Sequence, residues 1–353
     1  RKILIFVSLS GMALLAFVAI IYLTSQRGIG MTFDATIYIA AARHFLGNPT
    51  QNSTQNILLS YDFIRLHFPL FFPFFLSWCS RLSGFDPAEV VRWLHAAFLA
   101  CSVLFIGFLL EKYTKSFLIV IGGAFIAFFS SGVLSKYSSA FSEPTFIFFT
   151  FLWLIFFMDF LEGSKKQLSF ILCVAMTMLA CMTRLAGLTI VVTSIAGIFL
   201  FLKTRIRVRL IYTFILISIS LLPMFLWMGI NRHSVGMSND RLFFFHPPLV
   251  SEYNILKGIG LFNIGTLPFF VRNLVSVFII ICLALGWVIW KKRDKDAIAG
   301  IPEKVMVFIN VLFIFCLIYY VGLVLTMVFF DPSTNANDRI LLPMRIFLVL
   351  LTS

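Results

Sequence analysis

An uninterrupted apolar stretch near the start of the chain decides the fold class. Residues 3–24 read ILIFVSLSGMALLAFVAIIYLT and contain no charged side chain. A helix of about 20 apolar residues spans the ~30 Å hydrocarbon core of a bilayer. A membrane β-barrel would instead show segments of about 10 residues in which apolar and polar positions alternate. The stretch therefore predicts a membrane-spanning helix.

The composition of the whole chain extends this interpretation. Of its 353 residues, 60% are apolar and only 12% are charged, whereas a soluble domain carries about 25% charged residues. This excludes both an ordinary soluble protein and a disordered chain. We expect an all-α integral membrane protein, a polytopic helical bundle with about ten spans. The apolar runs place these spans at 3–24, 88–110, 117–138, 143–161, 167–182, 185–202, 208–230, 269–290, 304–330 and 339–353.

The basic residues predict the orientation of the bundle. The formal net charge of +13 would suggest a nucleic-acid partner in a soluble protein. In a membrane protein it reflects the excess of Lys and Arg in cytoplasmic loops, so no nucleic acid is expected. Basic clusters at 112–115, 165–166, 203–209 and 291–295 fall in short loops. The prediction is a multi-pass protein of the bacterial inner membrane with a cytoplasmic N-terminus.

Two long loops, 25–87 and 231–268, then lie on the outer face. Long loops carry function more often than tight turns do, so the active site is expected there. All of 1–353 is interpreted as one transmembrane domain. Because the chain stops inside an apolar run, we expect it to be truncated at its C-terminus.

Two apolar segments need a separate interpretation. As one helix, 167–202 would be ~54 Å long, so two short spans that meet at Thr183-Arg184 fit better. The segment 63–82 contains Pro69 and Pro73 and is short for a span. If it crossed the membrane, the basic residues of 112–115 would lie on the side opposite the other basic clusters. A juxtamembrane helical segment in the first outer loop is therefore expected.

The few acidic residues near the outer face are candidates for chemistry, because an ionisable group close to the membrane is costly. Within 33–49 the sequence predicts a short helix that begins at or near Asp34 and ends before Gly47. Its carboxylate is either a helix cap or a general base. Glu143, between Ser142 and Pro144, is either a helix-start residue or a polar support of the site.

Three arginines are candidates for binding an anionic group. Arg184 lies between two spans and needs an acidic or phosphate partner; the alternative is a structural ion pair with Glu143. Arg339 lies at the outer mouth of the last span, where a pair with Asp338 or snorkelling to the interface is the alternative. Arg241 belongs to the second long loop, which could hold an anionic head group or be an ordinary solvated loop.

Metal and cofactor motifs are not found in the sequence. The six cysteines lie in apolar runs, and no pair has metal-ligand spacing. Nucleotide-binding glycine patterns and HExxH are also missing. We therefore predict no metal site and no cofactor.

Five motifs stand out along the chain: Asp34…Tyr38…Ala42 with Gly47, Phe68-Pro69-Leu70, Ser142-Glu143, Thr183-Arg184 and Arg339-Ile340-Leu341-Leu342-Pro343. Together they resemble the GT-C superfamily of membrane glycosyltransferases. They occur in the family's order, and Ser138 to Gly187 is also locally similar to bacterial relatives of GPI mannosyltransferases. In three places the chain departs from relatives: Ala35 stands where protein O-mannosyltransferases carry Glu, the usual second Pro before Leu is replaced to give Phe68-Pro69, and Leu185 replaces a frequent Pro.

The resemblance implies inverting transfer of a sugar from a polyprenyl-phosphate carrier to a lipid, glycan or protein acceptor. The sugar is expected to be a hexose such as mannose. Asp34 would be the general base, and no divalent metal is expected. An apolar groove between spans would hold the prenyl chain. The residues expected to contact substrate are Tyr38, Glu143, Arg184, Arg241 and Arg339.

Three other functions stay open. An enzyme like the O-antigen ligases would rely on Arg and His of a long outer loop, with His233 and His246 in place of Asp34. A lipid transporter or flippase would place functional groups on both faces. A non-catalytic assembly subunit would keep the fold and lack activity.

Overall fold

The computed structural model describes residues 1–47, 69–163, 166–235, 302–330 and 339–352. All regular secondary structure in these ranges is helical, and six helices are long and apolar enough to cross a membrane. These six are Lys2–Leu23, Pro87–Thr114, Glu143–Leu161, Lys166–Thr183, Ile206–His233 and Glu303–Thr326. The prediction of an all-α, multi-pass membrane protein is confirmed. The predicted span at 269–290 lies outside the described residues.

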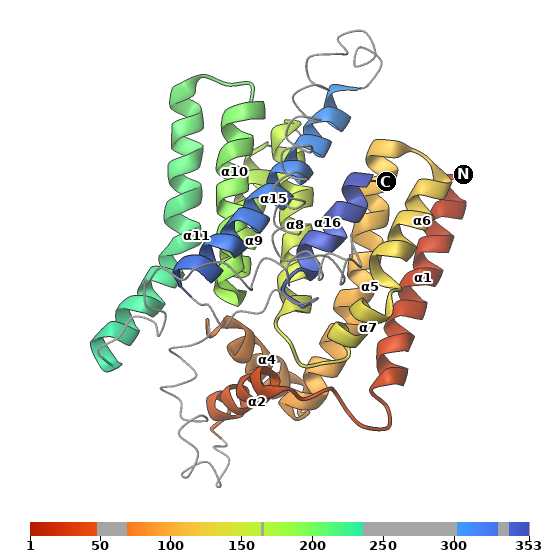
Figure 1. The fold of residues 1–353 in the computed structure, drawn as a ribbon, viewed down its shortest axis with the longest axis vertical. Helices are drawn as coiled ribbons and strands as arrows, with labels where there is room; N and C mark the ends of the chain where they lie inside the picture. The colour runs from red at the N-terminus through yellow and green to blue at the C-terminus, as the bar shows by residue number, and fades with distance from the viewer. Residues whose placement is uncertain (48–68, 164–165, 236–301, 331–338, 353) are drawn as a thin grey trace, which may run out of the picture.

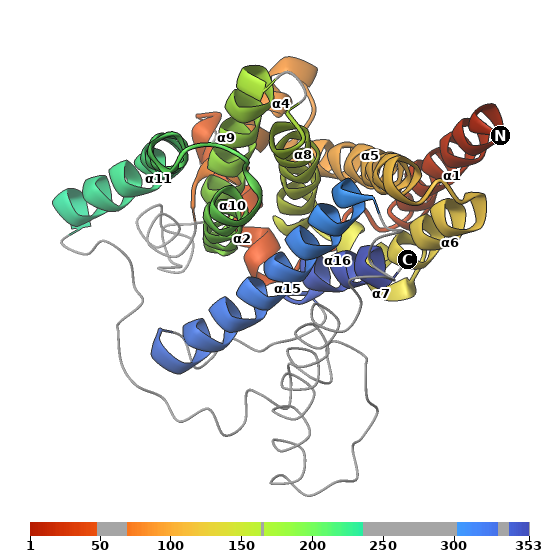
Figure 2. The ribbon, with the colours of Figure 1, turned by 90° about the horizontal axis from the view of Figure 1, so that it is seen from above.

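The helices form one bundle with α8 in the middle and α1 and α11 at its two edges (Figures 1 and 2). Helix α8 packs mainly on α9 and α5. Trp153 of α8 donates its indole N–H to Ser194 Oγ of α10 at 2.8 Å, which satisfies a polar group in the core. The helices are α1 (Lys2–Leu23), α2 (Phe33–Phe45), α4 (Phe71–Ser83), α5 (Pro87–Thr114), α6 (Phe117–Phe128), α7 (Ser131–Tyr137), α8 (Glu143–Leu161), α9 (Lys166–Thr183), η3 (Leu185–Gly187), α10 (Leu188–Phe201), α11 (Ile206–Val235), α15 (Glu303–Phe329) and α16 (Leu342–Thr352).

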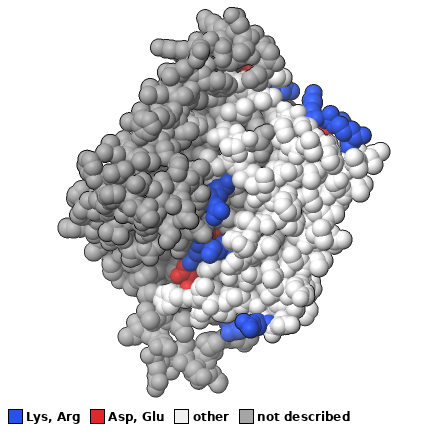
Figure 3. All heavy atoms as spheres, turned by 45° about the vertical axis from the view of Figure 1, so that its right-hand side comes forward, with Lys and Arg blue, Asp and Glu red and all other residues white. Residues whose placement is uncertain are grey.

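The surface agrees with a bilayer environment. On the face drawn in Figure 3, the described surface is nearly free of charge apart from one strip and a few spots near its edges. Large apolar side chains of α1, α6 and α11 are exposed, among them Phe6, Leu118 and Phe214. In water such faces would be unstable, whereas lipid tails cover them at no cost.

The segment 117–138, predicted as one span, consists of two helices. Helices α6 and α7 are bent by 60° relative to each other. Helix α6 ends at Phe128, and Ser130 then caps α7 by accepting a hydrogen bond from Val133 N at 3.4 Å. A serine cap satisfies an N–H of the new first turn, so the chain can restart a helix in another direction.

The split within 167–202 occurs where the sequence predicts it. Helix α9 ends at Thr183, Arg184 is extended, and η3 leads into α10. The turn is tight, because a Cβ on Gly187 would lie 2.5 Å from backbone atoms of Cys181. Only glycine allows this approach. Arg184 is thereby held at the break between two apolar helices.

The described part of the first long loop is helical, as predicted. Helices α2 and α4 pack on each other at one end of the bundle, hereafter the α2 end (Figure 1). Helix α4 has 13 residues and is only ~20 Å long, too short for a span. It buries Phe72 and Leu76 and exposes Phe74 and Trp78. This amphipathic pattern suits a helix that lies in the membrane interface.

Candidate functional site

Five of the six predicted site residues meet at the α2 end of the bundle. Asp34 and Tyr38 come from α2, and Glu143 is the first residue of α8. Arg184 comes from the break after α9, and Arg339 precedes α16. The sixth, Arg241, lies outside the described residues, as do Asp338 and His246. Segments that are far apart in sequence thus supply one polar cluster.

Glu143 is the centre of this cluster. Its Oε1 atom binds Arg184 Nη1 at 2.8 Å and also accepts from Arg339 Nε. Its side chain is only 1% exposed, and a carboxylate this deep needs charged partners. Pro144 stands in the first turn of α8, where a missing N–H costs nothing. Glu143 therefore begins the helix, as one interpretation has it, and its carboxylate also binds both arginines of the cluster.

Arg339 connects the two acidic residues. Its Nη2 atom lies 2.6 Å from Asp34 Oδ2, while its Nε binds Glu143. The guanidinium carbon lies 4.0 Å from the centre of the Phe141 ring, a cation–π contact. The planar fork of arginine can serve two carboxylates and stack on a ring at the same time, which lysine cannot do.

Asp34 is not the cap of α2. The N-cap is Thr32, whose Oγ1 accepts a hydrogen bond from Ala35 N at 3.4 Å. Asp34 lies in the first turn, where the helix dipole favours a negative charge. Its side chain is 25% exposed. The interpretation of Asp34 as a cap is therefore wrong, and its carboxylate is directed to Arg339.

Tyr38 reaches the cluster through Ser142. The Tyr38 hydroxyl lies 3.3 Å from Ser142 Oγ, and Arg184 Nη1 donates to the same Oγ at 3.0 Å. Burial raises the pKa of Tyr38 to about 12, although nearby Arg184 opposes the shift. The phenol stays protonated at physiological pH, so Tyr38 orients groups through hydrogen bonds and does not act as a base.

The connector between α7 and α8 is held from two sides. Gly30 donates to Ser138 O at 2.7 Å and accepts from Ala140 N at 3.0 Å. A Cβ on Gly30 would lie 2.7 Å from Ser139 Oγ. A larger residue would therefore push the two hydrogen-bonded backbone segments apart. His95 Nδ1 lies 3.1 Å from Tyr137 O. These contacts fix the backbone that presents Phe141, Ser142 and Glu143.

Sequence reasoning missed four contributors to this arrangement. Phe141 and Ser142 adjoin Glu143, but no spacing marks Phe141 as a cation–π partner. The hydroxyl of Tyr319 donates to Ile340 O at 2.6 Å and so positions the residue after Arg339. Gly30 and His95 lie in segments whose pattern carries no functional signal. Only their contacts in three dimensions identify them.

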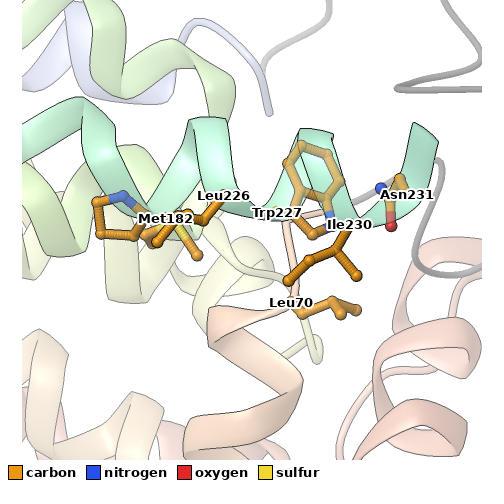
Figure 4. Close-up of a pocket in the computed structure, with 7 residues that line it drawn as sticks. Leu70, Met182, Leu226, Trp227, Ile230 and Asn231 are labelled. Atoms are coloured by element: carbon orange, nitrogen blue, oxygen red, sulfur yellow. The ribbon is translucent and has the colours of Figure 1, made fainter. Parts of the chain in front are cut away.

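An apolar pocket of about 350 Å³ lies beside the break that carries Arg184 (Figure 4). Met182 lines it two residues before Arg184, and Leu70 lines it from the start of α4. The indole N–H of Trp227 has no hydrogen-bond partner among the described residues. Such a pocket, apolar with few polar groups, suits a hydrocarbon chain. Its other lining residues are Pro223, Leu226, Ile230 and Asn231.

Metal ligands are not gathered in the part of the chain that the structure describes, where no three His, Cys, Asp or Glu residues could hold one ion. No protein-family model, no curated protein and no solved structure matches this chain.

Proposed function

We propose that the chain is a membrane glycosyltransferase of the GT-C type, with about ten spans, that uses a polyprenyl-phosphate sugar as donor. One observation carries the proposal: a partly exposed carboxylate, Asp34, lies in contact with a phosphate-compatible arginine, Arg339, at one end of the helical bundle. Transfer from a lipid phosphate requires this combination, a base for the acceptor and a cation for the leaving group.

The proposed reaction is one inverting displacement. Asp34 removes the proton from an acceptor hydroxyl while the hydroxyl oxygen attacks the anomeric carbon of the sugar. The bond between that carbon and the phosphate oxygen breaks, and its electron pair leaves with the lipid phosphate. The products are the glycosylated acceptor, the free lipid phosphate and protonated Asp34. The leaving group is already a stable anion, so no strong general acid is required.

The other residues have supporting roles. Arg339 and Arg184, with Arg241 from the undescribed loop, would stabilise the phosphate by charge-assisted hydrogen bonds. Glu143 holds both arginines of the described cluster, and Tyr38 orients Ser142 and Arg184. The pocket beside Met182 would accept part of the prenyl chain. The predicted orientation places this reaction on the outer face of a bacterial inner membrane, with a lipid, glycan or protein acceptor.

The test is sugar transfer by the full chain in liposomes. The assay uses radiolabelled polyprenyl-phosphate mannose, and polyprenyl-phosphate glucose in a parallel reaction, with a membrane extract as the source of acceptors. We expect Asp34→Asn to lower the rate at least about 100-fold, as for the loss of a general base. The matched control is Asp86→Asn, because Asp86 also pairs with an arginine, Arg43, of α2.

The control should retain the wild-type rate. Full activity of Asp34→Asn would refute the proposed mechanism. A second candidate, the non-catalytic subunit, is favoured by the charge compensation in the described cluster, where Glu143 binds both arginines and Asp34 binds Arg339. It predicts no turnover with either donor in the wild type. A ligase or a flippase would instead depend on His233 and His246 or on groups at both ends of the bundle.

A further inference from the structure

The charges of the described cluster are mutually compensated, although the proposed substrate is an anion. Asp34 and Glu143 bind the guanidinium groups of Arg184 and Arg339. A phosphate that approaches Arg339 therefore meets hydrogen-bond donors that already have carboxylate partners. For the phosphate to take the place of a carboxylate on Arg339 Nη2 or Nε, one ion pair has to open.

We propose that the phosphate of the donor displaces Asp34 from Arg339, so that donor binding releases the general base. The inference rests on the proposed function and adds an order of events to it. In the described state the base is restrained by the same arginine that would bind the leaving group. The ligand class is a phosphate monoester or diester, and the contested atom is Arg339 Nη2.

The two carboxylates differ in how easily they can be displaced. Glu143 is 1% exposed and its Oε1 serves two arginines. Its displacement would take the carboxylate from the mostly buried Arg184 and one of two ion pairs from Arg339, which is strongly unfavourable. Asp34 is 25% exposed and has one ion pair in the described structure. Water can solvate Asp34 once it is released, so the Asp34–Arg339 pair is the one that opens.

Both partners keep their places when the pair opens. Arg339 stays bound to Glu143 through Nε and stacked on Phe141, so its fork still faces the space that Asp34 leaves. Helix α2 is capped by Thr32 and not by Asp34, so its first turn does not depend on the ion pair. The N-terminal dipole of α2 partly compensates the released carboxylate. The exchange thus requires only a side-chain movement.

The exchange couples two requirements of the reaction. While Asp34 Oδ2 is bound to Arg339, that oxygen is not available to accept a proton from an acceptor hydroxyl. After the phosphate has taken its place, the carboxylate is free and the leaving group is already bound by a cation. Both oxygens of Asp34 are therefore available to an acceptor hydroxyl only when a donor is in the site.

The experiment measures binding of a phosphate probe to the full chain in detergent by isothermal titration calorimetry, at fixed ionic strength. The probes are geranyl phosphate and inorganic phosphate, whose comparison shows whether a lipid chain contributes. Because the probe no longer competes with a carboxylate, we expect Asp34→Asn to bind it about fivefold more tightly than the wild type. Asp34→Ser is the second variant, since serine is also compatible with the start of a helix.

Two control variants complete the design. Asp86→Asn, which frees Arg43 from a similar ion pair, should bind the probes like the wild type. Arg339→Gln should bind them at least about fivefold more weakly.

If the wild type binds a probe through Arg339 and neither Asp34 variant binds it more tightly, the displacement is refuted while the proposed function stands. If the wild type and the Asp34 variants all fail to bind either probe, both the displacement and the proposed function are refuted. Tighter binding by either Asp34 variant, together with unchanged binding by Asp86→Asn, supports the displacement.

Discussion

Helix α8 carries an acidic residue at each end, and the two surroundings differ. Glu143, at its start, binds Arg184 and Arg339, which come from distant segments. Glu162, which caps its other end, accepts from the Tyr113 hydroxyl at 2.5 Å and lies 3.1 Å from Lys112 Nζ. Both are carboxylates at the end of a spanning helix, yet only one is surrounded by arginine forks.

The two clusters differ in how strongly water competes for their ion pairs. Lys304, a third cation near Glu162, is 70% exposed and 3.9 Å away, a distance at which water competes well. The partners of Glu143 are mostly buried and donate through fixed planar groups. The lysines near Glu162 agree with the predicted excess of basic residues on the cytoplasmic side. At the Glu143 end, the partly exposed carboxylate of Asp34 contacts Arg339.

The largest expected effect comes from neutralising the two carboxylates in turn. Glu143→Gln removes the carboxylate that binds Arg184 and Arg339 and leaves Arg339 with its ion pair to Asp34. Because Arg184 loses its buried carboxylate partner, we expect the free energy of unfolding to fall by about 3 kcal/mol or more. Glu162→Gln keeps an acceptor for Tyr113, and we expect a loss of about 1 kcal/mol. Unfolding in detergent with increasing SDS, followed by tryptophan fluorescence, measures both.

Equal losses at the two ends would remove the distinction between the clusters. Glu143→Asp is the informative control, because it retains the charge on a shorter side chain. We expect it to recover part of the stability that Glu143→Gln loses. A full loss in Glu143→Asp would mean that packing, and not charge, accounts for the effect.

The second prediction concerns high pH. Burial raises the pKa of Tyr38 to about 12, from about 10 in an unfolded chain. Below pH 10 both states hold the proton and Tyr38 contributes no pH dependence. Between pH 10 and 12 only the unfolded state releases it, so the folded state loses about 2–3 kcal/mol of stability as the pH rises.

The variant Tyr38→Phe isolates this contribution. It lacks the ionisable group, so its stability should fall less steeply than that of the wild type above pH 10. At pH 8 it should lose about 1 kcal/mol, because the contact with Ser142 is missing. Thermal unfolding across pH 8 to 12 provides the measurement. Parallel curves for the two proteins would contradict the burial of this phenol in a folded cluster.

Much of the site could be predicted from the sequence, because charges are rare in this chain. Asp34, Glu143, Arg184 and Arg339 stand out among apolar residues, and the ion pair of Arg184 with Glu143 that the sequence suggested is present. Phe141 and Gly30 could not be predicted in the same way. An aromatic residue among 44 phenylalanines carries no individual signal, and the role of Gly30 depends on a contact with Ser139.

The fold was predictable to a similar degree and for a similar reason. Hydropathy locates apolar runs, and charge locates their ends, so the break at Arg184 could be inferred. The bend between α6 and α7 could not, because Ser130 is polar but uncharged and changes the hydropathy little. Thr32 likewise shows that a cap is decided by local hydrogen bonding, for which Asp34 was an equally good candidate.

The third prediction tests the arginine geometry. Arg339→Lys retains the positive charge but cannot bind Asp34 and Glu143 through two separate N–H groups while it stacks on Phe141. We expect a loss of about 1.5 kcal/mol of unfolding free energy, the value of one hydrogen bond to a charged group. Arg43→Lys, at the exposed pair with Asp86, is the matched control and should lose less than half of that.

The smallest expected effect lies at the opposite end of α8. Lys112 lies 2.9 Å from Asp159 and 3.1 Å from Glu162, and its side chain is 25% exposed. Lys112→Gln should therefore cost at most about 1 kcal/mol, and it should leave the binding of geranyl phosphate unchanged. Arg184→Gln, at the other end, should weaken that binding as well as the fold, because Arg184 belongs to the cluster that would hold the phosphate. The same titration of both variants checks this, and a phosphate affinity that falls equally in the two would mean that bulk charge, and not the geometry around Glu143, governs the binding of anions.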